Sequence, residues 1–529
     1  MTPPAVSKAA RRLCLALALS LGLAPMAPAQ VRLPALGESA SDDFSLTTEK
    51  RLGEQIMRDI RRDPDYADDP ALLEYLQSVW QPIVRAGRER GDIGPDVAGL
   101  FPFEAFLVRD RSVNAFALPG GYVGVHLGLI AMTVTRDELA SVLAHEFSHV
   151  SQRHIARSIS SAQRASTLGM AAMILGVLAA SRSSNPDMAQ AAIAGGQAAM
   201  LQSQLNFSRD MEREADRNGQ SLMAMAGFAP SGMGAMFAKL DQANRLNDNG
   251  AFPYLRSHPL TVERIGEAQQ RLGQLEGVAR APAEAQRWHA LMQARARVLM
   301  DPAADAMRRL QDLDKREGSA DERLAGLYAS ALASMQLREF DRAERALATV
   351  LALPEARSSA VTMRSFAQLT TQLALARGDA ASATRVAQAL EGDGSRPALL
   401  LRARVALASG EPGAVRASTE ALQTWVAEHR QDALAWQELA HLTERQGHTL
   451  RSLRAQAEAQ AALGNLQGAI DRLRAGQQLA RKAGAAGADY IEASVIDSRL
   501  RDLSGQRRAL LAEQRGNRGS GPKPDDSPD

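Results

Sequence analysis

The segment His145-Glu146-Phe147-Ser148-His149, with the spacing His-Glu-x-x-His, constrains this chain more than any other part of it. Residues four apart in an α-helix return to one face, so His145 and His149 can direct imidazole nitrogens at one metal ion. Glu146 then lies beside the ion, where its carboxylate can take a proton from water and pass it to a leaving amine. Because only nine histidines occur among 529 residues, this spacing predicts a zinc hydrolase site rather than a coincidence of two surface histidines.

The sequence around the motif predicts a regular helix. Thr135 and Glu138 match a capping box, with Thr135 as the N-cap residue. Apolar residues then recur at helical spacing, namely Leu139, Val142, Leu143, Phe147 and Val150. We therefore expect the motif to lie on a half-buried helix.

A catalytic zinc ion usually has three protein ligands and one open position, so a third ligand is needed. His154 is a poor candidate, because a continuing helix would turn it to the side opposite His145. Glu212 is a better one, and Asp216 on the same helical face would accept the free ring N–H of a ligand histidine, with His145 as the expected partner. Glu214 should face elsewhere. The alternative for this segment is a solvated, charged helix.

These motifs resemble those of the gluzincin metallopeptidases, the family that includes HtpX and the CaaX prenyl peptidase. The resemblance covers about residues 45–275 and rests on an ordered set of motifs: His145-Glu146-x-x-His149, Glu212-x-x-x-Asp216, Asn114-Ala115-Phe116-Ala117-Leu118-Pro119-Gly120-Gly121, and Ser257-His258-Pro259-Leu260 with Arg264. Both ends of the chain add a resemblance to periplasmic members of this family that carry C-terminal tetratricopeptide repeats.

The resemblance implies one zinc ion per chain, held by His145, His149 and Glu212. It also implies that His258 occupies the fourth zinc position and keeps the enzyme latent, or stabilises the oxyanion once it is displaced. An ordinary solvated loop histidine is the alternative. Arg264 is expected to brace the domain through a salt bridge.

The segment before the motif predicts a small β-sheet. Residues 103–108 and 122–125 are expected to form strands separated by the turn Pro119-Gly120-Gly121, after two helices between residues 45 and 92. By resemblance, residues 114–125 would pair with an extended peptide substrate through β-augmentation. A purely structural hairpin is the alternative.

The N-terminus reads as a secretory signal peptide over residues 1–29. Lys8, Arg11 and Arg12 precede an apolar core that is shorter than the roughly 20 residues needed to span a bilayer. The single cysteine, Cys14, lies within this segment, so the mature chain would contain no disulfide. These features predict export to the periplasm of a Gram-negative bacterium. A second apolar stretch, residues 168–180, is interpreted as a buried helix, with a mobile lid or a peripheral membrane contact as the alternative.

From about residue 290 the chain is rich in alanine and leucine with helical periodicity. Recurring glycines at Gly378, Gly410, Gly447 and Gly464 favour degenerate helix–turn–helix repeats of about 34 residues over an ordinary helical bundle. Stacked repeats present a concave surface that binds peptides or proteins. Nucleic-acid binding has little support, because the net charge is +2 and only 4% of residues are aromatic.

The fold class expected is mainly α, with a gluzincin-type metallopeptidase domain followed by an all-α repeat array. The expected divisions are a signal peptide at 1–29, a zinc metallopeptidase domain at 30–290, tetratricopeptide-like repeats at 291–512 and a disordered tail at 513–529. Resemblance implies a periplasmic endopeptidase that degrades misassembled outer-membrane β-barrel proteins, with a chaperone-like contribution. Its expected partners are misassembled proteins and the outer-membrane assembly machinery. The alternative is a repeat scaffold or holdase whose metal site is latent or blocked.

Overall fold

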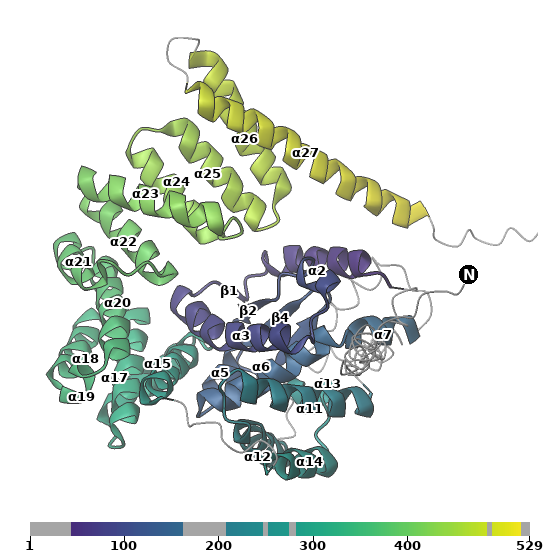
Figure 1. Ribbon diagram of the computed structural model, residues 1–529. Coiled ribbons are helices and arrows are strands. Elements are labelled where there is room, and N and C mark those ends of the chain that lie inside the picture. Colours follow the sequence, from purple (N-terminus) through teal and green to yellow (C-terminus); the bar gives the residue numbers. More distant parts are fainter. Residues whose placement is uncertain (1–43, 162–207, 247–251, 274–281, 484–488, 520–529) are drawn as a thin grey trace, which may run out of the picture.

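The computed structural model describes residues 44–161, 208–246, 252–273, 282–483 and 489–519 (Figure 1). The expected signal peptide, residues 1–29, and the apolar stretch 168–180 lie outside these residues. Among the helices that are described, none is both long and apolar enough to cross a membrane.

The expectation of a mainly α fold is confirmed, with a small sheet in the N-terminal half. The helices of this half are α2 (Leu46–Ile60), α3 (Pro70–Arg90), α4 (Pro95–Ala98), α5 (Leu127–Met132), α6 (Arg136–Ser151), α7 (His154–Ser161), α11 (Arg209–Met225), α12 (Ser231–Leu246), α13 (Pro253–Ser257) and α14 (Val262–Leu272). The two helices expected between residues 45 and 92 are α2 and α3. Ser45 and Asp69 cap their N-termini with side-chain oxygens, and Pro70 suits the first turn of α3 because that turn needs no N–H donor there.

Within the described ranges the sheet contains four strands in the order β1-β2-β4-β3. Their bounds are Tyr66–Ala67 for β1, Glu104–Val108 for β2, Ala115–Leu118 for β3 and Tyr122–His126 for β4. Strands β2 and β4 are parallel, and β3 pairs antiparallel with β4. The strands expected at 103–108 and 122–125 are therefore present, and β3 lies within residues 114–125, the segment expected to pair with substrate or to form a structural hairpin. The turn at Gly120 and Gly121 joins β3 to β4, so β3 lies at the sheet edge and β4 lies inside the sheet.

The C-terminal half consists of helices in the part that is described. They are α15 (Ala283–Leu299), α16 (Ala304–Gln311), η2 (Asp312–Lys315), α17 (Ala320–Gln336), α18 (Phe340–Ala352), α19 (Pro354–Arg357), α20 (Ala360–Arg377), α21 (Ala380–Ala387), η3 (Gln388–Leu390), α22 (Arg396–Ser409), α23 (Pro412–Glu428), α24 (Ala433–Arg445), α25 (Thr449–Ala462), α26 (Leu466–Ala483) and α27 (Tyr490–Gly519). Consecutive helices pack against each other, and the glycines that the sequence marked as turns all have positive φ. In Figure 1 the helices form an arc along the left side of the N-terminal half, and α27 extends above α2.

Two of the expected divisions fall inside helices. The division at residue 290 lies within α15, which packs against α3 and α5 on one side and α17 and α20 on the other. One hydrophobic core runs without interruption from Ala67 to Leu373, because α15 contributes buried side chains such as Leu291 to both halves. The tail expected to be disordered from residue 513 begins inside α27, which continues to Gly519 because good helix formers run through residues 509–515.

Candidate metal centre

Helix α6 carries the His-Glu-x-x-His segment and begins at the predicted capping box. The Thr135 side chain accepts from the Glu138 backbone N–H, and the Glu138 side chain accepts from the Thr135 backbone N–H. The expectation of a half-buried helix is wrong, because every residue from Glu138 to Val150 is buried. Helices α3, α11 and α12 and the sheet surround α6, so its polar side chains lie in the protein interior.

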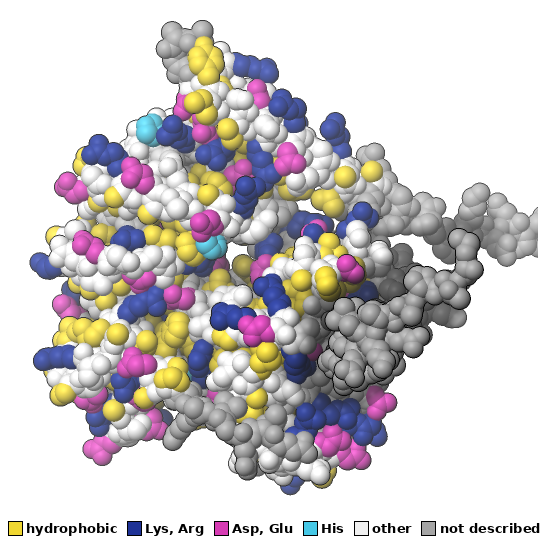
Figure 2. All heavy atoms as spheres, in the orientation of Figure 1, with side chains coloured by type: hydrophobic (Ala, Val, Ile, Leu, Met, Phe, Trp, Pro, Cys, Tyr) yellow, Lys and Arg dark blue, Asp and Glu magenta, His cyan; other side chains and the backbone are white. Residues whose placement is uncertain are grey.

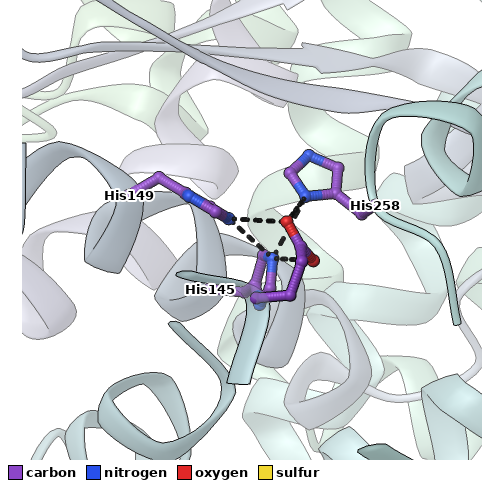
Figure 3. A group of neighbouring side chains, drawn as sticks. His145, His149 and His258 are labelled. Atoms are coloured by element: carbon purple, nitrogen blue, oxygen red, sulfur yellow. Dashed lines mark hydrogen bonds and ion pairs between the residues drawn. The ribbon is translucent and has the colours of Figure 1, made fainter. Parts of the chain in front are cut away.

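Four buried side chains converge at the centre of this arrangement (Figure 3). His145 and His149 come from α6, Glu212 from α11 and His258 from the residue that ends α13, and their potential ligand atoms all lie within 4.8 Å of one another. The Nε2 atoms of His145 and His149 are 3.0 Å apart. Glu212 lies 3.5 Å from His145 Nε2, 3.4 Å from His149 Nε2 and 2.9 Å from His258 Nδ1. Figure 3 shows the three labelled imidazole rings gathered around one carboxylate group.

Glu146 lies next to this cluster and is fully buried. Neither of its carboxylate oxygens accepts a hydrogen bond from the described residues, and His258 Nε2 is 3.5 Å from Oε1. Burying an ionised carboxylate in this way costs free energy unless a positive charge compensates it. Imidazole nitrogens that face each other at 3.0 Å beside two carboxylates are a donor set that suits zinc, so these residues fit the metal that the sequence predicts.

A second carboxylate on α11 supports the cluster. Asp216 accepts a hydrogen bond from His145 Nδ1 at 2.9 Å, as the sequence analysis expected. Arg264 of α14 donates to Asp216 through Nε at 2.6 Å and also lies 2.9 Å from Glu212 through NH1. The expected salt bridge of Arg264 is therefore present, and it fixes both carboxylates that face the histidines.

Burial and charge shift the pKa values within this cluster in opposite directions. Burial disfavours a charge on His145, but the hydrogen bonds that its ring donates to Asp216 and Glu212 outweigh burial and raise the pKa of His145 to about 10. Burial holds the pKa of His149 well below its usual value. Burial also opposes ionisation of Glu212, but the charge of His258 and hydrogen bonds from the histidines lower the pKa of Glu212 below the ordinary value. The buried carboxylates thus favour a positive charge within the cluster, which a bound cation would also supply.

His154 lies in a different place from the one expected. The backbone of Arg153 has φ of 52°, which ends α6 and starts α7 in a new direction. As a result His154 points back toward the motif, with its Nδ1 2.8 Å from Nδ1 of His149. Its Nε2 lies 3.2 Å from Glu214 Oε2, so Glu214 stands outside the four-residue cluster but is linked to it.

Tyr254 of α13 is a further residue of the site that the sequence motifs did not indicate. Its ring stacks on His258 with centroids 4.7 Å apart, and burial raises its pKa well above the ordinary value. The spacing of four between Tyr254 and His258 was the available signal, because it places both rings on one side of a helical turn.

Comparisons with known proteins agree with this geometry. A family profile described as Peptidase family M48 matches residues 94–272, which include the whole cluster. The chain is 30% identical over 449 residues to the Beta-barrel assembly-enhancing protease of Yersinia pestis, an alignment that covers 84% of this chain and 87% of that protein. The chain belongs to peptidase family M48.

The chain is also similar to two further proteins. It is 35% identical over 340 residues to the Putative beta-barrel assembly-enhancing protease of Vibrio cholerae serotype O1, with 63% of this chain and 66% of that protein covered. It is 30% identical over 239 residues to the Mitochondrial metalloendopeptidase OMA1 of Schizosaccharomyces pombe, with 44% of this chain and 63% of that protein covered. The resemblance drawn from the motifs is confirmed. As an M48 protein the chain is a zinc metallopeptidase, and its buried cluster is consistent with a metal site.

Proposed function

We propose that this chain is a periplasmic zinc endopeptidase that degrades misassembled outer-membrane β-barrel proteins and contributes, like a chaperone, to those that can still assemble. The observation that carries the hydrolytic part is Glu146, a buried carboxylate with no hydrogen bond among the described residues, placed against four potential metal ligands. The relatives from Yersinia and Vibrio are named as β-barrel assembly-enhancing proteases, which supports the β-barrel substrates and, with the signal-like N-terminus, the periplasmic location.

In this proposal His145, His149 and Glu212 would hold one zinc ion, which would supply Lewis acidity to a peptide carbonyl and to a water molecule. Glu146 takes the proton from the attacking water and returns it to the leaving amine. Asp216 keeps the ring of His145 in its ligand orientation by accepting a hydrogen bond from the Nδ1–H group of that ring. His258 closes the remaining side of the cluster as a gate, or donates to the oxyanion when it swings aside.

Substrates would approach through the sheet edge and the helical repeats. Among the described strands, β3 pairs with β4 alone, so its other edge would add an extended peptide by main-chain hydrogen bonds. The helix pairs from α17 onward provide the surface that would bind misassembled proteins and components of the β-barrel assembly machinery.

The test combines metal analysis with a casein-cleavage assay on the mature protein. We expect about one zinc ion per chain and cleavage that Glu146→Gln abolishes while zinc is retained, because the amide cannot take a proton. Glu428→Gln, a change of the same type at an exposed position of α23, should leave both readouts unchanged. A wild-type protein without zinc would contradict the proposal.

A second candidate is a scaffold or holdase whose metal site stays blocked. The position of His258 favours this candidate, because its ring lies 2.9 Å from Glu212 and contacts the rings of both motif histidines. Complementation of a deletion strain separates the two functions. Full complementation by Glu146→Gln would favour the scaffold, and failed complementation by a stable, zinc-loaded variant would favour the protease.

A further inference from the structure

The far side of the His149 ring has a partner that the proposed mechanism does not use. Nε2 of His149 faces the cluster, so its Nδ1 points away from it, toward His154. Both imidazole rings are fully buried, and the two Nδ1 atoms are 2.8 Å apart. At this distance one nitrogen must carry the proton and the other must accept it.

The hydrogen bonds further out decide which nitrogen accepts. His154 Nε2 lies 3.2 Å from Glu214 Oε2, and a carboxylate is an acceptor. His154 therefore carries its proton on Nε2 and presents a lone pair on Nδ1. His149 must then carry its own proton on Nδ1, which leaves Nε2 unprotonated toward the cluster. Arg157 also donates to Glu214 Oε2, at 3.1 Å, and keeps that carboxylate in place.

We propose that Glu214 and His154 act as a positioning relay that fixes the tautomer and the ring orientation of His149 for metal binding. The inference rests on the zinc site of the proposed function. His145 has its carboxylate, Asp216, in direct contact, whereas His149 reaches its carboxylate through a second imidazole. Partners of this kind raise the metal affinity of the histidine that they orient.

The backbone of the chain is shaped to bring the relay together. His154 can turn back toward His149 only because Arg153 adopts a left-handed conformation between α6 and α7. Arg153 is itself held in place, since its side chain donates to Glu49 at 3.0 Å and to the backbone oxygen of Phe44 at 2.8 Å. These two contacts hold Arg153 in its rarely populated backbone conformation and thereby keep His154 in a fixed position beside His149.

The experiment measures the zinc dissociation constant by chelator competition, with the visible spectrum of the cobalt-substituted protein as a second readout. We expect His154→Phe, which keeps a ring but has no acceptor, to weaken zinc binding about 10- to 100-fold and to change the cobalt spectrum. His154→Asn can offer its Oδ1 to the Nδ1–H of His149, so it should restore most of the affinity. His289→Phe is the matched control, because His289 is also a buried histidine with two hydrogen bonds, but its partners, Tyr75 and Thr133, lie outside the cluster.

The possible results test the relay independently of the proposed function. Zinc affinity of His154→Phe equal to the wild type, or equal losses in His154→Phe, His154→Asn and His289→Phe, would overturn the relay and leave the protease proposal standing. A selective loss in His154→Phe, together with no casein cleavage by the wild type, would support the relay and count against the protease. A wild type that binds no zinc would overturn both.

Discussion

The charged side chains around the cluster show why it suits a divalent cation. Three carboxylates, those of Glu146, Glu212 and Asp216, are buried within reach of the histidines. Arg264 compensates part of their charge by contacting Glu212 and Asp216, whereas Glu146 accepts no hydrogen bond from the described residues and has only the His258 ring nearby, at 3.5 Å. A bound divalent ion would balance the remaining negative charge without the need for a second buried cation.

The first prediction concerns His258. Replacing it with alanine removes the ring that lies 2.9 Å from Glu212 and 3.5 Å from Glu146. If the ring restrains the site, His258→Ala should increase basal casein cleavage several-fold and change the zinc dissociation constant. If both quantities stay at wild-type values, His258 has no role at the metal.

A second residue-scale prediction concerns pH. Burial lowers the pKa of His289 from 6.5 to about 4. Its Nε2 donates to the Thr133 carbonyl and its Nδ1 accepts from the Tyr75 hydroxyl, an arrangement that needs the neutral ring. Because the folded pKa is below the unfolded one, the stabilisation is complete above pH 6.5 and is lost as the pH falls toward 4.

The free energy of unfolding should therefore fall by roughly 3 kcal/mol over this window through His289 alone. Urea unfolding at several pH values measures this fall in the free energy of unfolding. His289→Gln should flatten the dependence on pH, whereas His448→Gln, at an exposed histidine, should not. A wild-type midpoint that stays constant between pH 7 and 4 would refute this assignment.

At the scale of elements, the site depends on how closely α11 crosses α6. Gly219 lies at this crossing, and a Cβ atom there would be 3.1 Å from the backbone nitrogen of His145. The absence of a side chain lets α11 bring Glu212 and Asp216 against the histidines of α6.

We predict that Gly219→Ala separates the two helices and destabilises the fold by about 1–3 kcal/mol, with a parallel loss of zinc affinity. Gly234 of α12 is the matched control, because a Cβ atom there would meet no atom within 4 Å. Gly234→Ala should be neutral or stabilising by up to about 1 kcal/mol, since alanine favours helix more than glycine. Thermal unfolding and chelator competition measure the two effects, and a Gly219→Ala protein with unchanged zinc affinity would show that the crossing does not set the site.

At the scale of the whole molecule, arginines of the helical array bind the start of α3. Arg396 of α22 lies 2.7 Å from Asp68 and donates to Asp432 at 2.7 Å. Arg364 of α20 lies 2.7 Å from Glu74 in the same way. These ion pairs join the two halves beside their shared hydrophobic core. On the face shown in Figure 2, Lys and Arg side chains are interspersed with Asp and Glu side chains.

The corresponding prediction is that Arg396→Met loosens the contact between the halves. It leaves Asp68 and Asp432 without their arginine partner, which should cost about 3 kcal/mol for a largely buried pair. Arg404→Met removes a pair with Glu438 inside the array, at a more exposed position, and should cost less than about 1 kcal/mol. Urea unfolding and amide exchange in α3 and α22 measure the difference. Equal effects of both changes would mean that Arg396 does not link the halves.

The motif, the capping box and the apolar faces of the first two helices follow from the sequence because they depend on residues within one or two helical turns. The helical array follows for the same reason, since its turn glycines have the positive φ that their positions predicted. The pairing of His145 with Asp216 also agrees with prediction, because a helical repeat of four fixed which face of α11 carries both carboxylates.

Only the tertiary structure decided the features that depend on where the chain changes direction. Because Arg153 adopts a left-handed backbone conformation, His154 contacts His149, whereas a continuing helix would have turned His154 to the opposite side. Strand β3 took the sheet edge and α6 became buried on all sides, because pairing and burial depend on elements distant in sequence. The position of residue 290 within α15 also depends on packing, since α15 contributes side chains to one core shared by both halves. Local periodicity fixes which residues can face one another, and long-range packing selects which of them meet.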